Sequence, residues 1–149
     1  MLAKIISLLS LVFISLDVNS QGHIEHIKNQ EYLKYRHSVD CNNLPGDNLS
    51  ERICANLAFQ KSDSLLVVVY TSLLSKARIH YKDSLEFKLI RVQAVWRKFR
   101  DQHCGLIFDS YENCGSCHQR SIAYLNCLKE LTDDRIKELE RMSKQIAGE

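Results

Sequence analysis

One uninterrupted stretch, residues 85–104, constrains the fold of this chain more than any other. It reads LEFKLIRVQAVWRKFRDQHC and contains neither proline nor glycine. Its apolar residues recur at alternating steps of four and three, the spacing of one face of an amphipathic helix. We therefore predict a long central helix that ends near Gly105 and packs this face into the core of a small bundle. The apolar positions are Leu85, Leu89, Val92, Trp96 and Phe99, and Trp96 is the only tryptophan.

Turn and cap signals around this stretch predict the other helices. Glycine occurs five times and proline once among 149 residues, which favours helices over a turn-rich β-sandwich. Asn48 and Glu51 form a capping box that opens a first helix, expected to run to about Arg78. Ser116 and Thr132 are placed to cap two further helices. The predicted fold class is all-α, a single small bundle of about four helices.

The first twenty residues have the pattern of a cleavable signal peptide. Lys4 precedes an apolar segment, residues 5–16, that is too short to span a bilayer. Val18 and Ser20 supply small residues at the two key positions of a signal-peptidase site. We expect residues 1–20 to be removed and the protein to be exported, to a periplasm or to the extracellular space.

The remaining chain is predicted to consist of a polar N-terminal arm, residues 21–39, and a helical domain, residues 40–149. Removal of residues 1–20 takes away one lysine and one aspartate and leaves the net charge at +2. So small a charge argues against nucleic acid or an anionic membrane surface as a partner. No stretch after residue 20 is apolar over a length that spans a membrane.

Export would place the cysteines in an oxidising compartment, where disulfides form. An even number of cysteines in a short exported chain predicts disulfides, although the pairing does not follow from the count. The six cysteines are Cys41, Cys54, Cys104, Cys114, Cys117 and Cys127.

Three blocks of residues follow one another along the domain. The first contains Asp40-Cys41, Glu51-Arg52, Cys54, Asp63, Leu66 and Tyr70. The second, from Gln93 to Cys104, reads Q-x-x-W-x-x-x-R-D-x-x-C, and the third, from Cys127 to Leu139, reads C-x-x-x-x-T-x-x-R-x-x-x-L. Together they resemble the LprI-like lysozyme inhibitor family of small exported bacterial proteins, over about residues 40–140.

The resemblance implies an all-helical domain with two disulfides, and it implies inhibition of lysozyme, the activity for which the family is named. The chain departs from the family pattern in two places. Val67 stands where members often have asparagine after the leucine matched by Leu66. Cys114 and Cys117 resemble an addition in a variable loop.

Four of the cysteines make physical sense as two bridges. A Cys41–Cys54 bridge would join the first loop to the first helix and contribute on the order of 3 kcal/mol through the unfolded state. A Cys104–Cys127 bridge would join the end of the central helix to the third helix. Such bridges supplement the modest core of a small domain.

The last two cysteines leave alternatives open. Cys114 and Cys117, followed by His118, match C-x-x-C-H, the attachment pattern of c-type haem. A zinc site with His103, or a redox-active dithiol at a helix start, uses the same thiols. We favour a third, local disulfide, because the oxidising compartment promotes it and the remaining pattern is that of a bundle.

Two sets of polar residues are candidates, one for a structural role and one for binding a partner. The first set is expected to orient helices through hydrogen bonds and ion pairs: Asp63, Gln93, Trp96, Arg100, Asp101 and Arg135. The second set is expected to face a protein partner from a loop: Asp109, Glu112, His118 and Arg120. No carboxylate pair, nucleophile elbow, phosphate loop or zinc helix is evident. We therefore expect no catalytic activity, no cofactor and no bound metal.

The predicted function is that of an exported binding protein that blocks the active site of a lysozyme. Its cations for the carboxylates of the cleft would come from Arg97 and Lys98 or from the loop around His118 and Arg120. Two other functions compete with it. One is a c-type haem or redox protein, and the other is a structural or ligand-binding envelope module without lysozyme activity. The sequence does not indicate an oligomeric state.

Overall fold

A computed structural model describes residues 31–81, 83–111, 114 and 118–147. These residues form a short 3₁₀ helix, η1 (Glu31–Ser38), and three long α-helices. The α-helices are α3 (Asn48–Tyr81), α4 (Asp83–Asp109) and α5 (His118–Ala147), and the described residues contain no strand. The all-α class is confirmed, with three long helices instead of about four. The predicted signal peptide, most of the predicted arm, Glu112, Ser116 and Cys117 lie outside the described residues.

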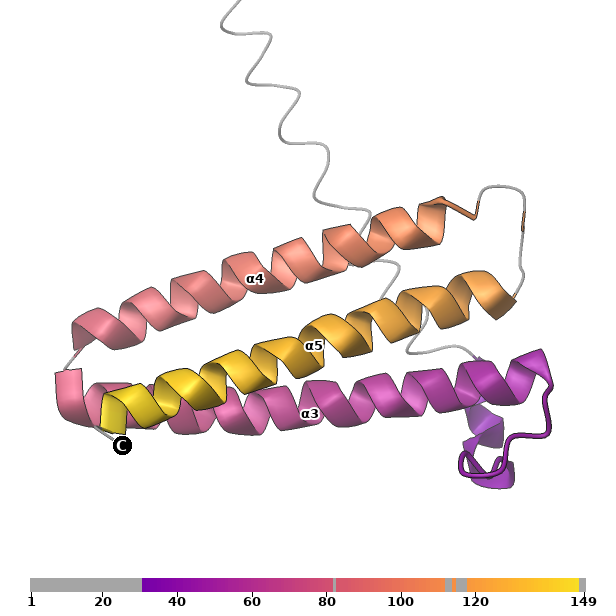
Figure 1. Ribbon diagram of the computed structural model, residues 1–149, viewed down its shortest axis with the longest axis horizontal. Helices are drawn as coiled ribbons and strands as arrows, with labels where there is room; N and C mark the ends of the chain where they lie inside the picture. The colour runs from indigo at the N-terminus through magenta and orange to yellow at the C-terminus, as the bar shows by residue number, and fades with distance from the viewer. Residues whose placement is uncertain (1–30, 82, 112–113, 115–117, 148–149) are drawn as a thin grey trace, which may run out of the picture.

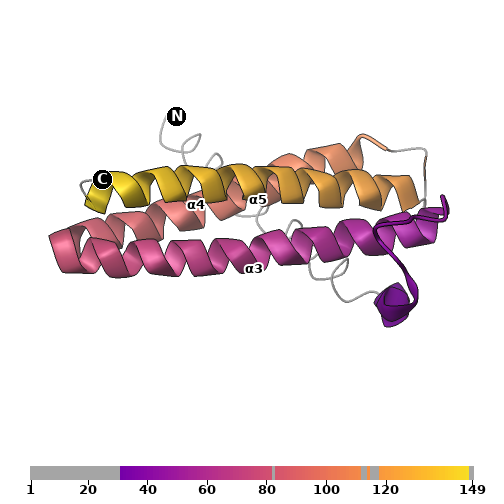
Figure 2. The ribbon, with the colours of Figure 1, turned by 60° about the horizontal axis from the view of Figure 1, so that its bottom comes forward.

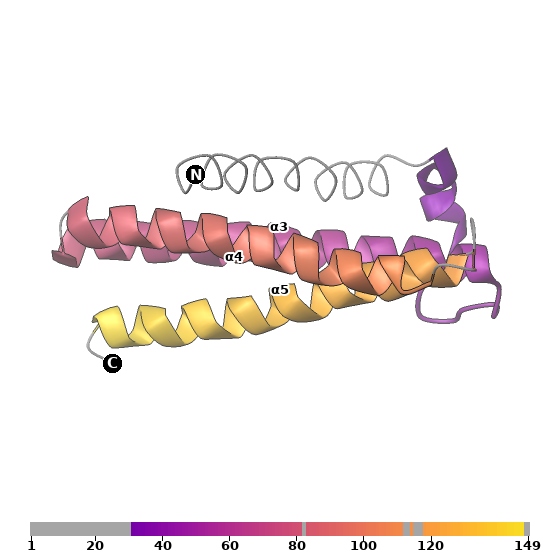
Figure 3. The ribbon, with the colours of Figure 1, turned by 90° about the horizontal axis from the view of Figure 1, so that it is seen from above.

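The three long helices run side by side as an up-down-up bundle (Figures 1 and 2). The α4 helix is antiparallel to both α3 and α5, and η1 lies beside the N-terminal part of α3. Seen from above, α4 and α5 are close where α5 begins and diverge toward its C-terminal end (Figure 3).

The core consists of two apolar clusters, one toward each end of the bundle. One surrounds the Cys104–Cys127 disulfide and contains Phe59, Tyr124 and Leu128. The other lies toward the α3–α4 connection and is built from aliphatic side chains: Leu66, Leu73, Ala77, Leu89, Ile136 and Leu139. At the α3–α4 connection itself, Arg78 of α3 forms an ion pair with Glu86 of α4.

The start of α3 differs by one residue from the predicted capping box. The cap is Asp47, whose side-chain oxygen accepts the backbone N–H of Ser50 at 2.8 Å. Its carbonyl oxygen accepts the N–H of Glu51 at 3.1 Å. The hydrogen bonds with Ser50 lower the pKa of the Asp47 carboxyl. Asn48 instead accepts a hydrogen bond from Gln119 of α5 at 2.8 Å.

The two helices predicted to start at Ser116 and Thr132 are a single helix in the structure. Residues 118–147 contain no glycine or proline, so nothing interrupts α5. The Thr132 hydroxyl donates to the carbonyl of Leu128, one turn earlier, at 2.6 Å, and it is fully buried. Thr132 is therefore a helix-interior residue whose hydroxyl is satisfied within the bundle, and the prediction of a cap was wrong.

The central helix also extends beyond its predicted end. Gly105 lies inside α4, which continues to Asp109. Ile107 and Phe108 pack against the cluster around the disulfide, and this burial outweighs the low helix propensity of glycine.

The conformation of Gly105 leads to a prediction about stability. A Cβ added there would meet no atom within 4 Å, so we expect Gly105→Ala to raise the free energy of unfolding by about 0.5–1 kcal/mol. Urea denaturation followed by circular dichroism measures the change. Gly46→Ala is the matched control and should lower stability, because Gly46 has a φ of 78°. A loss of stability in Gly105→Ala would contradict the helical environment described.

The buried face of α4 is only partly the predicted one. Leu89 is buried and Leu85 and Trp96 are partly buried against the core, but Val92 and Phe99 are half exposed. The other buried positions on this helix are the disulfide-bonded Cys104 and two polar residues, Gln93 and Arg100. The helix is turned about its axis relative to the prediction, because two polar side chains find partners on the neighbouring helices.

Candidate functional site

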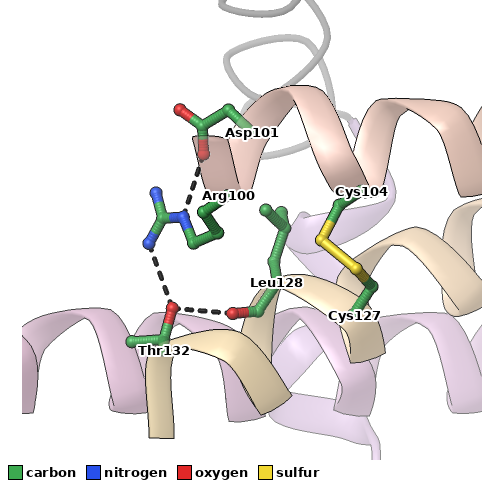
Figure 4. Close-up of a disulfide and its surroundings, with 6 residues drawn as sticks. All are labelled: Arg100, Asp101, Cys104, Cys127, Leu128 and Thr132. Carbon is green, nitrogen blue, oxygen red and sulfur yellow. Dashed lines mark hydrogen bonds and ion pairs between the residues drawn. A yellow bond between two sulfur atoms is a disulfide. The ribbon is translucent and has the colours of Figure 1, made fainter. Parts of the chain in front are cut away.

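A buried polar layer separates the two apolar clusters, and Arg100 is its centre. Arg100 as a whole residue is only 4% exposed. Nη1 donates to Asp63 Oδ1 of α3 at 2.9 Å and to Thr132 Oγ1 of α5 at 3.0 Å, and Nε donates to Asp101 Oδ1 of α4 at 2.9 Å. Figure 4 shows this group directed at Thr132, one turn of α4 away from the Cys104–Cys127 disulfide. One side chain thus makes hydrogen bonds to all three long helices.

Aromatic rings border the same layer. The Arg100 Cζ lies 5.5 Å from the ring centroid of Phe59 and 5.3 Å from that of Trp96. The Arg135 Cζ lies 5.6 Å from the ring of Trp96. These distances are those of cation–π contacts, which are stronger where water is excluded. Trp96 therefore connects the two buried arginines.

Arg135 of α5 makes the second cross-helix contact. Its Nε donates to Gln93 Oε1 of α4 at 3.0 Å, and its Nη1 donates to Glu138 Oε2 at 2.8 Å. The structure thus brings the first set of predicted residues into one network through Arg100, Trp96 and Arg135. Sequence reasoning missed Thr132, which it treated as a cap, and Phe59. The spacing T-x-x-R, which puts Thr132 and Arg135 on one face of α5, is the signal that points to the former.

The chemistry available in this layer is that of helix association. Asp63 and Asp101 both bond the same guanidinium, so they form no pair of an acid and a base facing a substrate. Burial, reinforced by the charge of Asp101, raises the pKa of the Tyr124 phenol. The described residues contain no group of three or more histidine, cysteine or acidic side chains able to hold a metal ion.

The predicted partner-binding loop is occupied by contacts within the chain. Arg120 of α5 donates from Nε to the carbonyl of Phe108 at 2.7 Å, and its Cζ lies 3.8 Å from the Phe108 ring. It also forms an ion pair with Asp109 at 3.5 Å. Arg120 therefore satisfies the C-terminal end of α4, where a cation is favourable. His118 is the first residue of α5 and half-buried, and its Nδ1 has no hydrogen-bond partner among the described residues.

Both expected disulfides are present in the structure. The Cα atoms are 5.5 Å apart in Cys41–Cys54 and 5.7 Å apart in Cys104–Cys127. Cys114 is disulfide-bonded as well. Its predicted partner, Cys117, lies outside the described residues. A sulfur held in a disulfide has no thiol to bond a haem vinyl group, so the structure gives no support to haem attachment at Cys114.

A groove lies between α4 and α5, next to the polar layer, and Trp96 and Arg135 belong to both. Its volume is about 570 Å³. Valine, aromatic and charged side chains line it. The lining residues are Lys88, Arg91, Val92, Val95, Trp96 and Phe99 of α4, with Arg135 and Glu138 of α5.

These features define a small helical domain held by disulfides and a buried arginine layer. The family model described as lysozyme inhibitor LprI matches residues 41–139, which is more than half of the chain. The chain therefore belongs to the LprI family, and the resemblance predicted from the three sequence blocks is confirmed. Comparison with curated proteins and with solved structures found no match. Within the described part of the chain, no helix combines the length and the apolar character needed to cross a bilayer.

Proposed function

We propose that this protein is an exported inhibitor that binds a lysozyme and slows cell-wall hydrolysis. The observation that carries the proposal is the match to the lysozyme inhibitor family over residues 41–139. The two disulfides fit an oxidising compartment outside the cytoplasm, in agreement with the expected signal peptide. The polar network joins helices instead of facing a substrate, which favours a binding role over an enzymatic one.

The inhibitory contact is expected on the outer side of α4. A lysozyme cleft presents two carboxylates, and an inhibitor can block it by inserting a cation between them. Arg120 is engaged with Phe108 and Asp109, which makes the loop a poorer source of that cation. Arg97 is exposed on α4, and its neighbour Lys98 is exposed as well. Because neighbouring residues of a helix point about 100° apart, the two cations face different directions, and Arg97 is the one tested below.

A turbidity assay on suspended cell walls tests the function. The purified protein should slow clearing in a dose-dependent way, to about one-tenth of the uninhibited rate at ten times the dissociation constant. The assay should include an animal lysozyme and a bacterial muramidase, with reduced and alkylated protein as the negative control. No slowing at large molar excess of the folded protein would contradict the proposal. The envelope-module function would then replace it.

A charge reversal on α4 tests the surface separately. Arg97→Glu should weaken inhibition by at least tenfold, because a new carboxylate would face those of the cleft. Lys61→Glu, an exposed charge reversal on α3, is the matched control and should leave inhibition unchanged. Equal inhibition by both variants would reject the outer side of α4 as the contact and leave the inhibitory function intact.

A further inference from the structure

The α4 helix carries an apolar stripe that the other two long helices do not cover. Val92, Val95 and Phe99 are 53%, 69% and 52% exposed. They follow one another at steps of three and four, so they lie on one side of the helix. Leu106, seven residues beyond Phe99, extends the same side and is 70% exposed. Scattered apolar residues on a surface are ordinary, but a continuous stripe of this kind marks a site of interaction.

The stripe forms one wall of the groove between α4 and α5. Lining residues from Lys88 to Phe99 span about 16 Å along the axis of α4, at 1.5 Å per residue. That length accepts about three turns of another helix. The two helices diverge toward this end of the bundle (Figure 3), and a helix laid in the groove would become the fourth helix of the bundle.

The charges of the groove select the kind of occupant. Lys88 and Arg91 are exposed on α4, whereas Arg135, which is buried, and Glu138 line the groove from α5. Because Arg135 is ion-paired with Glu138 at 2.8 Å, the cationic surplus of the groove rests on Lys88 and Arg91. An occupant with carboxylates beside its apolar side chains complements this surplus, whereas a lysine-rich segment is repelled. A second copy of this chain would bring the same cationic surface and add to the surplus.

We propose that the groove between α4 and α5 binds an amphipathic helix of a partner protein, with aliphatic side chains on one face and carboxylates beside them. The aliphatic face would cover Val92, Val95 and Phe99, and the carboxylates would meet Lys88 and Arg91. Helix binding in an apolar groove is a common mode of protein recognition. Arg97 and Lys98 are not among the residues that line the groove, so this interaction is separate from the proposed inhibition of lysozyme.

Trp96 provides a direct probe of the groove. It lines the groove, it is partly buried, and it is the only tryptophan of the chain. The probe ligand is a synthetic, tryptophan-free helical peptide with leucines at helical spacing, flanked by glutamates. Titration of the full mature protein with this peptide should shift the Trp96 emission to shorter wavelength and saturate. A peptide with every glutamate replaced by lysine should bind at least tenfold more weakly.

Two valine substitutions test the location. Val95→Glu places a carboxylate on the stripe and should weaken binding of the glutamate peptide at least tenfold. Val68→Glu is the matched control, because Val68 is 64% exposed on α3 and does not line the groove. It should leave the affinity unchanged. Circular dichroism should show the same helix content in both variants, since each changes an exposed residue.

Several results would overturn the proposal. Binding of neither peptide would show that the groove does not accept such a helix. Equal binding of both would show that charge does not select the occupant. Equal loss of affinity in the two valine variants would place the peptide outside the groove. Sedimentation of the protein alone could show a concentration-dependent dimer that Val95→Glu abolishes. That result would assign the groove to a second copy of the chain.

Discussion

Replacement of Arg100 by alanine is expected to lower the free energy of unfolding by about 3–5 kcal/mol. The substitution removes a buried cation and leaves the carboxylates of Asp63 and Asp101 without its charge. It also removes a donor to the fully buried Thr132 hydroxyl and a cation next to the ring of Phe59. The loss is large because groups already taken out of water keep their desolvation cost when the partner is gone.

Urea denaturation at neutral pH, followed by circular dichroism, measures this loss. Arg97→Ala is the matched control, because Arg97 is exposed on the same helix, three residues away, and should change stability by less than about 0.5 kcal/mol. Arg100→Lys should fall between the two, since lysine keeps the charge but cannot reproduce the planar set of donors. A loss below about 1 kcal/mol in Arg100→Ala would show that the polar layer contributes little to stability.

Family membership and the disulfides could be predicted from the sequence because they depend on residue identity and spacing. The positions of the long helices were also predictable, since apolar periodicity and the absence of proline act locally. The rotation of α4 about its own axis could not be predicted from the sequence. Its apolar residues fill two adjacent stripes, and periodicity alone does not say which one is buried. Gln93 and Arg100 determine which stripe is buried. Gln93 bonds Arg135 of α5, 42 residues away in sequence, and Arg100 bonds Asp63 of α3, 37 residues away.

The ends of the helices could not be predicted from local sequence either. Thr132 has the chemistry of a cap, but a threonine inside a helix can bond the carbonyl one turn back, as it does to Leu128. Gly105 has the chemistry of a stop, but its cost of about 1 kcal/mol is smaller than the gain from burying residues that follow it. Tertiary contacts therefore overrule local preference at both positions.

The candidate surfaces were the least predictable part. Arg120 was expected to face a partner, but its main acceptor is the backbone carbonyl of Phe108, an atom that every residue type provides. The groove follows from the rotation of α4 and from the divergence of α4 and α5, neither of which the sequence specifies. Both surfaces depend on how complete helices pack, which is a property of the whole bundle.

Removal of the Cys104–Cys127 disulfide is the second change with a large expected effect. The bridge joins α4 to α5 across 23 residues of sequence, and both cysteines are buried. Constraint of the unfolded chain over such a loop is worth about 3.4 kcal/mol. The double substitution Cys104→Ser and Cys127→Ser adds the cost of two buried hydroxyls, so the loss should exceed that value.

The Cys41–Cys54 bridge provides the comparison for that experiment. It closes a loop across 13 residues, for which the same relation gives about 3 kcal/mol, and Cys41 is exposed. If chain entropy alone acted, the two double-serine variants would lose nearly equal stability. We expect the Cys104–Cys127 variant to lose more, because the bridge lies in the apolar cluster one turn from Arg100.

The melting temperature of the Cys104–Cys127 variant should fall by more than about 10 °C. Equal losses would show that the bridge acts only on the unfolded chain, and combination with Arg100→Ala should then be additive instead of coupled.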